Sequence, residues 1–208
     1  MPDALDNILP ADSFVRMDES SDAEFYSEPR FVAHIDPATI EALTEFYRTF
    51  IPDNADVLDL MSSWISHLPL DKPYGRVAGL GMNAAELAAN EQLSDFLVHD
   101  LNVDPAVPYP NDVFDRVAIA VSIQYLTKPV DVLESVGATL RAGGQICIAM
   151  SHRLFPTKAI QAFHRLSPSD RVRLVQTYLE LAGYRDVRFI DESPANADPL
   201  WLVVGTQP

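Results

Sequence analysis

Residues 57–68 read V-L-D-L-M-S-S-W-I-S-H-L, and residues 77–87 read V-A-G-L-G-M-N-A-A-E-L. The second stretch matches the G-x-G-x-x-G/A pattern of dinucleotide-binding proteins at Gly79, Gly81 and Ala84. That pattern normally follows the first strand of its fold. Because the first stretch already supplies a buried strand and a segment that can begin a helix on a serine hydroxyl, residues 77–87 are better explained as the second strand-and-helix unit.

The rest of the chain alternates predicted strands and helices. Apolar runs predict strands at 55–61, 76–80, 95–99, 113–121, 145–150, 184–190 and 200–205. Helical spacing and capping residues predict helices at 36–51, 62–68, 83–90, 130–140 and 167–182. This alternation implies a mostly parallel sheet with helices on both faces. The last two strands have no helix between them, so we expect them to form an antiparallel pair.

Length and composition restrict the class of protein. The chain has 208 residues, and we expect an acidic N-terminal extension over residues 1–35 and one domain over residues 36–208. A net charge of −15 opposes binding to a phosphate backbone, so nucleic acid is not an expected partner. No apolar run is long enough for a membrane span, and the single cysteine, Cys147, excludes an internal disulfide. These features are typical of a soluble, cytoplasmic protein.

An ordered set of short motifs resembles a known family. The motifs are V-L-D-L at 57–60, the stretch at 77–87, V-H-D at 98–100, V-F-D-R-V at 113–117, S-I-Q-Y-L at 122–126 and L-R-A-G-G at 140–144. From about residue 55 to its end, the chain resembles class I S-adenosylmethionine-dependent methyltransferases of the type 11-like group. The resemblance implies an α/β, Rossmann-like fold: a central, mostly parallel seven-stranded sheet with the last strand antiparallel and helices on both faces. It also implies methyl transfer from S-adenosyl-L-methionine to a small-molecule acceptor, with S-adenosyl-L-homocysteine as product.

The resemblance also implies roles for individual residues. Asp59 matches the acid near the methionine end of the cofactor, and Asp100 matches the acceptor of the adenine amino group, with Leu101 near the ring. The segment from Ser122 to Tyr125 matches the stretch beside the transferred methyl group. The cofactor-binding residues expected from this resemblance are Asp59, Met61, Ser62, Ser63, Trp64, Gly79, Gly81, Met82, Asn83, Asp100, Leu101, Ser122 and Gln124.

Two departures from the family pattern concern the cofactor. The turn after the first strand should be rich in glycine, which tolerates positive φ, but residues 61–65 read M-S-S-W-I. The acid that binds both ribose hydroxyls in the family is replaced by Gly81, and Asn83 is expected to supply one of the missing hydrogen bonds. The apparent dinucleotide pattern therefore lies where the ribose acid should be.

Catalytic candidates follow from where side chains leave the predicted sheet. Methyl transfer needs a base only when the acceptor must lose a proton. We expect His67, Tyr125 and His152 to be catalytic candidates, because each follows a predicted strand at the edge where open α/β sheets bind ligands. A structural role is an equal alternative for His67, and packing in the core is an equal alternative for Trp64. The pattern contains no metal-ligand set.

Substrate contacts are expected from two basic or aromatic segments. Residues 151–173 carry an excess of bases, and Arg153 is the expected contact for an anionic group of the acceptor. The other bases of that stretch, Lys158 included, are expected to solvate a helix surface. Tyr26 and Arg30 lie in the N-terminal extension, which in this family often covers the pocket, so we expect a lid there.

Two other functions remain open. The departures from the glycine and ribose patterns favour a catalytically silent, methyltransferase-like scaffold that binds another protein. Retention of Asp59 and Asp100 favours an enzyme. A nicotinamide-dependent oxidoreductase is a further alternative, which depends on the glycine pattern at 77–87 and on Asp100 as the ribose acid. The sequence makes no prediction of oligomeric state.

Overall fold

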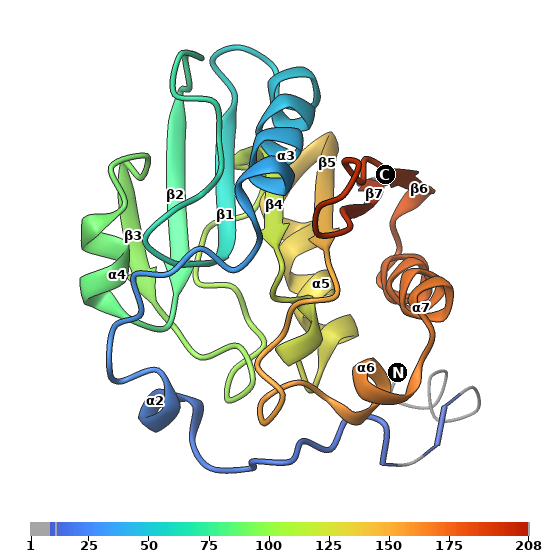
Figure 1. Cartoon of the computed structure of the whole chain (residues 1–208). Coiled ribbons are helices and arrows are strands. Elements are labelled where there is room, and N and C mark those ends of the chain that lie inside the picture. The colour runs from blue at the N-terminus through green and yellow to red at the C-terminus, as the bar shows by residue number, and fades with distance from the viewer. Residues whose placement is uncertain (1–8, 11, 208) are drawn as a thin grey trace.

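The computed structural model describes residues 9–10 and 12–207, so residues 1–8 and 11 of the predicted extension lie outside the described residues. A seven-stranded sheet with the order β3-β2-β1-β4-β5-β7-β6 forms its centre (Figure 1). The strands are β1 Asp56–Ser62, β2 Arg76–Gly81, β3 Asp95–Val98, β4 Phe114–Ala120, β5 Leu140–Met150, β6 Arg185–Asp191 and β7 Trp201–Thr206. β7 is antiparallel to both β5 and β6, and the other pairs are parallel. The predicted fold class is confirmed.

Side-chain caps start three of the helices. The Asp36 carboxylate accepts from the Thr39 N–H, and Ser167 caps its helix through the Asp170 N–H, as the sequence predicts. Asn83 caps the helix after β2 in the same way. The helices are α2 Asp22–Phe25, α3 Pro37–Phe50, α4 Ala84–Ala89, α5 Pro129–Thr139, α6 Gln161–Arg165 and α7 Pro168–Leu181, with a 3₁₀ turn at Ile123–Tyr125. None of the helices within the described ranges is long and apolar enough to cross a membrane.

The helix predicted at 62–68 is wrong. The chain between β1 and β2 has no helix. The hydroxyls of Ser62 and Ser63, on which we expect that helix to start, donate instead to the carboxylates of Asp59 and Glu86. His67 also has a φ of 57°, which a right-handed helix excludes. The connection from β3 to β4 has no helix either, so the predicted alternation is incomplete.

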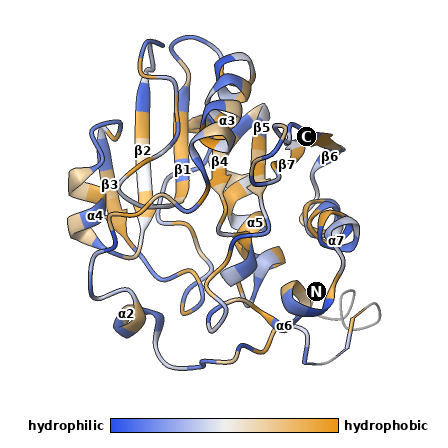
Figure 2. Cartoon of the chain, in the orientation of Figure 1, coloured by the Kyte–Doolittle hydropathy of each residue, from blue (hydrophilic) through white to orange (hydrophobic). Residues whose placement is uncertain are grey.

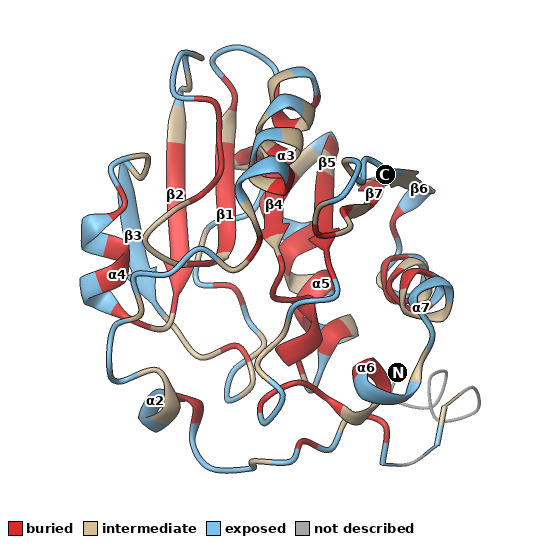
Figure 3. Ribbon diagram, in the orientation of Figure 1, coloured by how far each residue is buried: buried red, intermediate tan, exposed pale blue. Residues whose placement is uncertain are grey.

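Each face of the central sheet packs against helices. On one face, α3 contributes Leu43, Tyr47 and Phe50 to a cluster with side chains of β1, β2 and β5. On the other face, α5 and α7 cover a larger cluster. Figure 2 shows hydrophobic residues concentrated in the central strands, and Figure 3 shows the same strands buried while β3, at the sheet edge, is exposed. No helix between β1 and β2 packs on the first of these faces. α3, which precedes β1, covers that face instead.

Residues 12–36 run along the carboxyl edge of the sheet, across the lower part of Figure 1. The beginning of this segment pairs with the α6 region, where the carbonyl oxygen of Val15 accepts from the Gln161 N–H at 2.9 Å. An isolated antiparallel bridge joins Arg16 to Ile160. The segment therefore crosses the edge of the sheet at which parallel α/β folds bind ligands.

The two glycines of β2 are explained by packing. β1 has a bulge at Met61, which lies in the left-handed region at φ 58° and shifts the pairing with β2. A Cβ added at Gly81 would collide with the backbone carbonyl oxygen of Ser62 on this bulge. A Cβ added at Gly79 would meet only the end of the Leu93 side chain. Gly79 lies inside the strand and Gly81 is its last residue, so neither belongs to the strand-to-helix turn that a dinucleotide fingerprint requires.

We predict that Gly81→Ala destabilises the protein and that Gly79→Ala does so much less. The added methyl group at position 81 must displace backbone, which costs roughly 1–3 kcal/mol in the free energy of unfolding. At position 79, the Leu93 side chain can rotate away. Urea unfolding of the two variants measures both changes, and equal losses of stability would contradict the bulge as the reason for Gly81.

Candidate functional site

A cavity of about 110 Å³ lies at the carboxyl ends of β1, β2, β3 and β4. The sheet order reverses between β1 and β4, and open α/β sheets bind ligands at such a switch point. Residues that follow each of the four strands form its walls, and the N-terminal segment and Phe155 complete them. Of the predicted site residues, the cavity is lined by Tyr26, Arg30, Asp59, Met61, Ser62, Ser63, His67, Gly81, Met82, Asn83, Asp100, Leu101, Ser122 and Tyr125.

Asp59 organises the wall that follows β1. Its Oδ2 accepts hydrogen bonds from the hydroxyls of Ser62 and Ser66, the latter at 2.7 Å. Burial raises the pKa of the Asp59 carboxyl to about 6, although these two hydrogen bonds favour its ionised form. The carboxylate therefore holds the irregular chain after β1 in place, in the position that the glycine turn takes in the family.

Three residues of the cavity wall have strained backbones. Met61, His67 and Val121 have φ values of 58°, 57° and 50°, in the left-handed region that non-glycine residues rarely enter. The conformation is least favourable for Val121, because its side chain is branched at Cβ. Strain of this kind concentrates at ligand sites, where the surrounding structure enforces it.

Three buried polar atoms of the wall have no hydrogen-bond partner among the described residues. They are Nδ1 of His67, the hydroxyl of Ser122 and Nη1 of Arg30. His67 and Ser122 are each 7% exposed. Burial lowers the pKa of His67 to about 4, with a further contribution from His34, so its imidazole is neutral at pH 7. An unsatisfied buried polar group costs free energy, and a ligand that bonds to it removes that cost.

Asp100 lies at the end of β3. Its Oδ1 accepts from the backbone N–H groups of Asn102, at 2.9 Å, and Val103, at 3.3 Å, which closes a turn. These bonds use one carboxylate oxygen, and Oδ2 has no hydrogen bond among the described residues. Asp100 and Leu101 both line the cavity, as the resemblance implies.

The end of β2 lacks a group that can bind ribose hydroxyls in the predicted way. Oδ1 of Asn83 accepts from the N–H groups of Ala85 and Glu86, and its Nδ2 donates to the carbonyl oxygens of Tyr26 and Ser27. The Asn83 amide is therefore fully used in capping α4 and in holding the N-terminal segment. The contact of Asn83 with the ribose stays a prediction, and the hydrogen bonds that its amide already forms do not support it.

Glu86 is a carboxylate of the cavity that sequence reasoning missed. It is 7% exposed, and it accepts from the backbone N–H of Arg30 and from the hydroxyl of Ser63, both at 2.6 Å. The sequence presents it as the third residue of a short helix, a position where glutamate is common. Only the approach of the N-terminal segment makes it part of the cavity.

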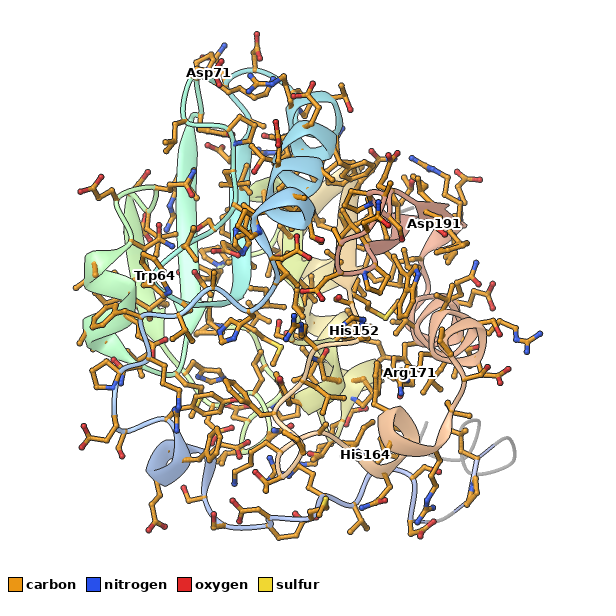
Figure 4. The ribbon with its side chains drawn as sticks, viewed as in Figure 1. Trp64, Asp71, His152, His164, Arg171 and Asp191 are labelled. Carbon is orange, nitrogen blue, oxygen red and sulfur yellow. The ribbon has the colours of Figure 1, made fainter. Side chains whose placement is uncertain are left out.

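Five of the predicted site residues do not line the cavity: Trp64, Gly79, Gln124, His152 and Arg153. The indole N–H of Trp64 donates to the Val32 carbonyl oxygen. His152 and Arg153 both contact the carboxylate of Asp198, at 3.0 Å. Figure 4 shows His152 on the β5 side of the molecule, well separated from Trp64. Their roles in catalysis or substrate binding stay predictions.

The predicted solvation of Lys158 is wrong. Its side chain is completely buried, and its ammonium group lies 3.2 Å from a carboxylate oxygen of Asp18 and 3.3 Å from one of Asp22. Asp22 also forms a buried ion pair with Arg16 at 2.7 Å and accepts from the Asn102 amide. In the sequence, Asp22 lies among other acids and Lys158 among other bases, and each pattern predicts a charge exposed to water. Only the fold brings these two side chains together.

We predict that the free energy of unfolding of the natural protein falls as the pH rises from about 4 to 6, and that the Asp59→Asn variant lacks this fall. The pKa of Asp59 is raised by burial to about 6, so the folded state keeps a proton that the unfolded state releases near pH 4. The stability of the natural protein therefore falls across this window, by at most about 1.4 kcal/mol per pH unit for one group. Urea unfolding at a series of pH values measures it, and parallel curves for the two proteins would contradict the shift.

Comparison with known proteins supports the fold. No family model matches the chain, and no curated protein gives a significant match. Among solved structures, a methyltransferase from Aquifex aeolicus described as S-adenosylmethionine-dependent superimposes with a TM-score of 0.58 at 17% identity, over 83% of this chain and 99% of that one. A second such methyltransferase, from Mesorhizobium loti, has a TM-score of 0.57 at 14% identity, over 79% and 97% of the two chains.

A third similar structure is the [4+2]-cyclase SpnF, with a TM-score of 0.58 at 13% identity over 81% of each chain. At these identities the likeness shows the fold and nothing finer. The chain has the class I methyltransferase fold, as its motifs predict.

Proposed function

We propose that this protein binds S-adenosyl-L-methionine in the cavity and transfers its methyl group to a small-molecule acceptor. The observation that carries the proposal is the convergence of Asp59, Asp100 and Ser122 on one cavity. Asp59 lies in β1, Asp100 and Ser122 follow β3 and β4, and the three lie far apart in the sequence. The resemblance gives each of them a contact with a different part of the same cofactor.

The residues present fit this cofactor in part. In this proposal Oδ2 of Asp100 accepts from the adenine amino group, and the wall held by Asp59 contacts the methionine end; that both acids line the cavity supports these roles. Unpartnered polar atoms on His67 and Ser122 provide two further hydrogen bonds. The ribose acid of the family is absent, because a side chain at Gly81 would collide with Ser62. We therefore expect weaker binding of the ribose than the family pattern gives.

When bound, the cofactor supplies an activated methyl group, and the protein orients the acceptor and excludes water. The imidazole of His67 is neutral at pH 7 and lines the cavity, so it can accept a hydrogen bond from an acceptor hydroxyl or ammonium group, while its lowered pKa makes it a weak base. Tyr125 also lines the cavity, and its hydroxyl oxygen accepts from the Phe155 N–H at 2.8 Å. This bond leaves the tyrosine proton available for a ligand.

The acceptor is a small molecule in this proposal, because the cavity is small and the N-terminal segment forms part of its wall. Ligand sites usually have volumes of about 300–1,000 Å³. The cavity of about 110 Å³ is smaller, so we expect the N-terminal segment to move when ligands enter. The expected anionic acceptor loses its support from the basic stretch, since Arg153 pairs with Asp198 and Lys158 pairs with Asp18 and Asp22.

A second candidate function is ligand binding without methyl transfer. The position of the missing ribose acid favours it, because the fold here cannot restore that side chain without moving β1. The fold also hosts other chemistry, as the [4+2]-cyclase among the similar structures illustrates. The nicotinamide alternative has the least support, since its glycines lie in β2.

The first experiment is a titration of the purified protein with S-adenosylhomocysteine, S-adenosylmethionine and NAD, by calorimetry and thermal melting. A ligand at about 100 times its dissociation constant adds about 2.7 kcal/mol of stability. We expect both adenosyl ligands to bind, and we expect Asp100→Asn to weaken S-adenosylhomocysteine at least about tenfold, through loss of a charge-assisted hydrogen bond. Asparagine keeps Oδ1 for the turn, so the variant should remain folded.

Asp104→Asn is the matched control, because Asp104 also accepts a backbone N–H in the same loop but does not line the cavity. Its affinity for S-adenosylhomocysteine should equal that of the natural protein. Binding of NAD alone would overturn the proposal in favour of the oxidoreductase. Absence of binding by all three ligands would favour a scaffold that binds a protein.

A further inference from the structure

The N-terminal extension contributes a strap to the cavity, which we define as residues 22–36. Asp22, Tyr26, Arg30 and His34 of the strap line the cavity. Asp22 fixes its beginning through the buried ion pairs with Arg16 and Lys158. The strap therefore forms part of the site, and it carries one side chain whose chemistry the proposed function leaves unused.

That side chain is Arg30. Of the described residues that line the cavity, it is the one lysine or arginine, and four carboxylates, of Asp22, Asp59, Glu86 and Asp100, line the same cavity. Asp22 has its own basic partners outside the cavity, and no salt bridge joins Arg30 to an acid within the described part of the chain. A guanidinium group that lines a cavity without an acidic partner favours an anionic group on the ligand.

The guanidinium of Arg30 is held in a fixed orientation. Its Cζ lies 4.4 Å from the centre of the Phe25 ring, and its Nη2 donates to the Phe25 carbonyl oxygen at 2.8 Å. The backbone N–H of Arg30 donates to Glu86. Nη1 is buried and has no hydrogen-bond partner among the described residues. Stacking on Phe25 and the Nη2 hydrogen bond thus fix the side chain, the bond to Glu86 fixes the backbone, and Nη1 is left unsatisfied beside the cavity.

We propose that Arg30 binds the carboxylate of the amino-acid part of the cofactor, so that ligand binding holds the strap closed. This inference rests on the proposed function. A carboxylate is the acceptor that best matches an arginine fork, and the amino-acid part supplies the one carboxylate of the cofactor. The strap then responds to the carboxylate of the ligand: a nucleoside that lacks this group enters the same cavity without engaging Arg30.

The test compares S-adenosylhomocysteine with 5′-methylthioadenosine, which shares the thioether nucleoside but has no amino-acid group. Both are titrated by calorimetry into the natural protein, Arg30→Met and Arg30→Lys. In Arg30→Met we expect S-adenosylhomocysteine to bind at least about tenfold more weakly, the effect of one lost charge-assisted hydrogen bond. Affinity for 5′-methylthioadenosine should change by less than about twofold. Arg30→Lys should lie between, because it keeps the charge and loses the fork.

Arg173→Met is the control, since Arg173 lies exposed on α7 and does not line the cavity. It should bind both ligands as the natural protein does. Equal losses for both ligands in Arg30→Met would overturn the inference and indicate a purely structural arginine. Unchanged affinity for S-adenosylhomocysteine would overturn it as well. Failure of the natural protein to bind either nucleoside would overturn the proposed function together with this inference, so the two failures are distinguishable.

Amide hydrogen exchange provides a second readout that does not depend on affinity. At saturating ligand, S-adenosylhomocysteine should slow exchange over residues 22–36 more than 5′-methylthioadenosine does. In Arg30→Met at saturation, the two ligands should give the same protection. Equal protection by the two ligands in the natural protein would show that the strap does not respond to the carboxylate and would overturn the inference.

Discussion

The buried carboxylate of Asp59 is the constraint on which the rest of the site depends. By accepting from Ser62 and Ser66, it draws the chain after β1 inward and prevents the helix that the residues could form. The same geometry places Met61 in a bulge with positive φ, and the bulge brings the Ser62 carbonyl against β2. One buried group thus connects the missing helix, the altered glycine turn and the missing ribose acid.

Several residues that differ from the methyltransferase sequence pattern form hydrogen bonds with the strap. Ser63 joins Glu86, which accepts from the backbone of Arg30, and Asn83 holds the carbonyl oxygens of Tyr26 and Ser27. Trp64 donates to Val32 and packs its ring against Phe31. The polar and aromatic side chains in place of glycines and the ribose acid therefore have a shared structural reason, which is to fix the strap over the end of the sheet.

The charged side chains are of two kinds, exposed acids and buried groups in ion pairs. Most of the net charge of −15 lies on exposed acids, which water solvates at little cost. A smaller set is buried in compensated clusters, where Arg16 and Lys158 surround Asp22. Removal of one member of such a cluster leaves an uncompensated buried charge, so the cluster strongly favours the closed position of the strap. Near the cavity, Arg30 alone has no acidic partner of this kind.

The sequence by itself determined the sheet, because apolar strand runs and helix caps are local signals. Asp36, Ser167 and the paired strands at the end of the chain illustrate this, and so does the placement of Asp59 in β1 and of Asp100 just after β3. Only the tertiary structure decided which side chains share the cavity. Glu86 and Lys158 acquire their roles from segments more than fifty residues away, and Gly81 from a bulge on the neighbouring strand. Contacts between distant segments depend on the three-dimensional path of the chain, which local patterns do not encode.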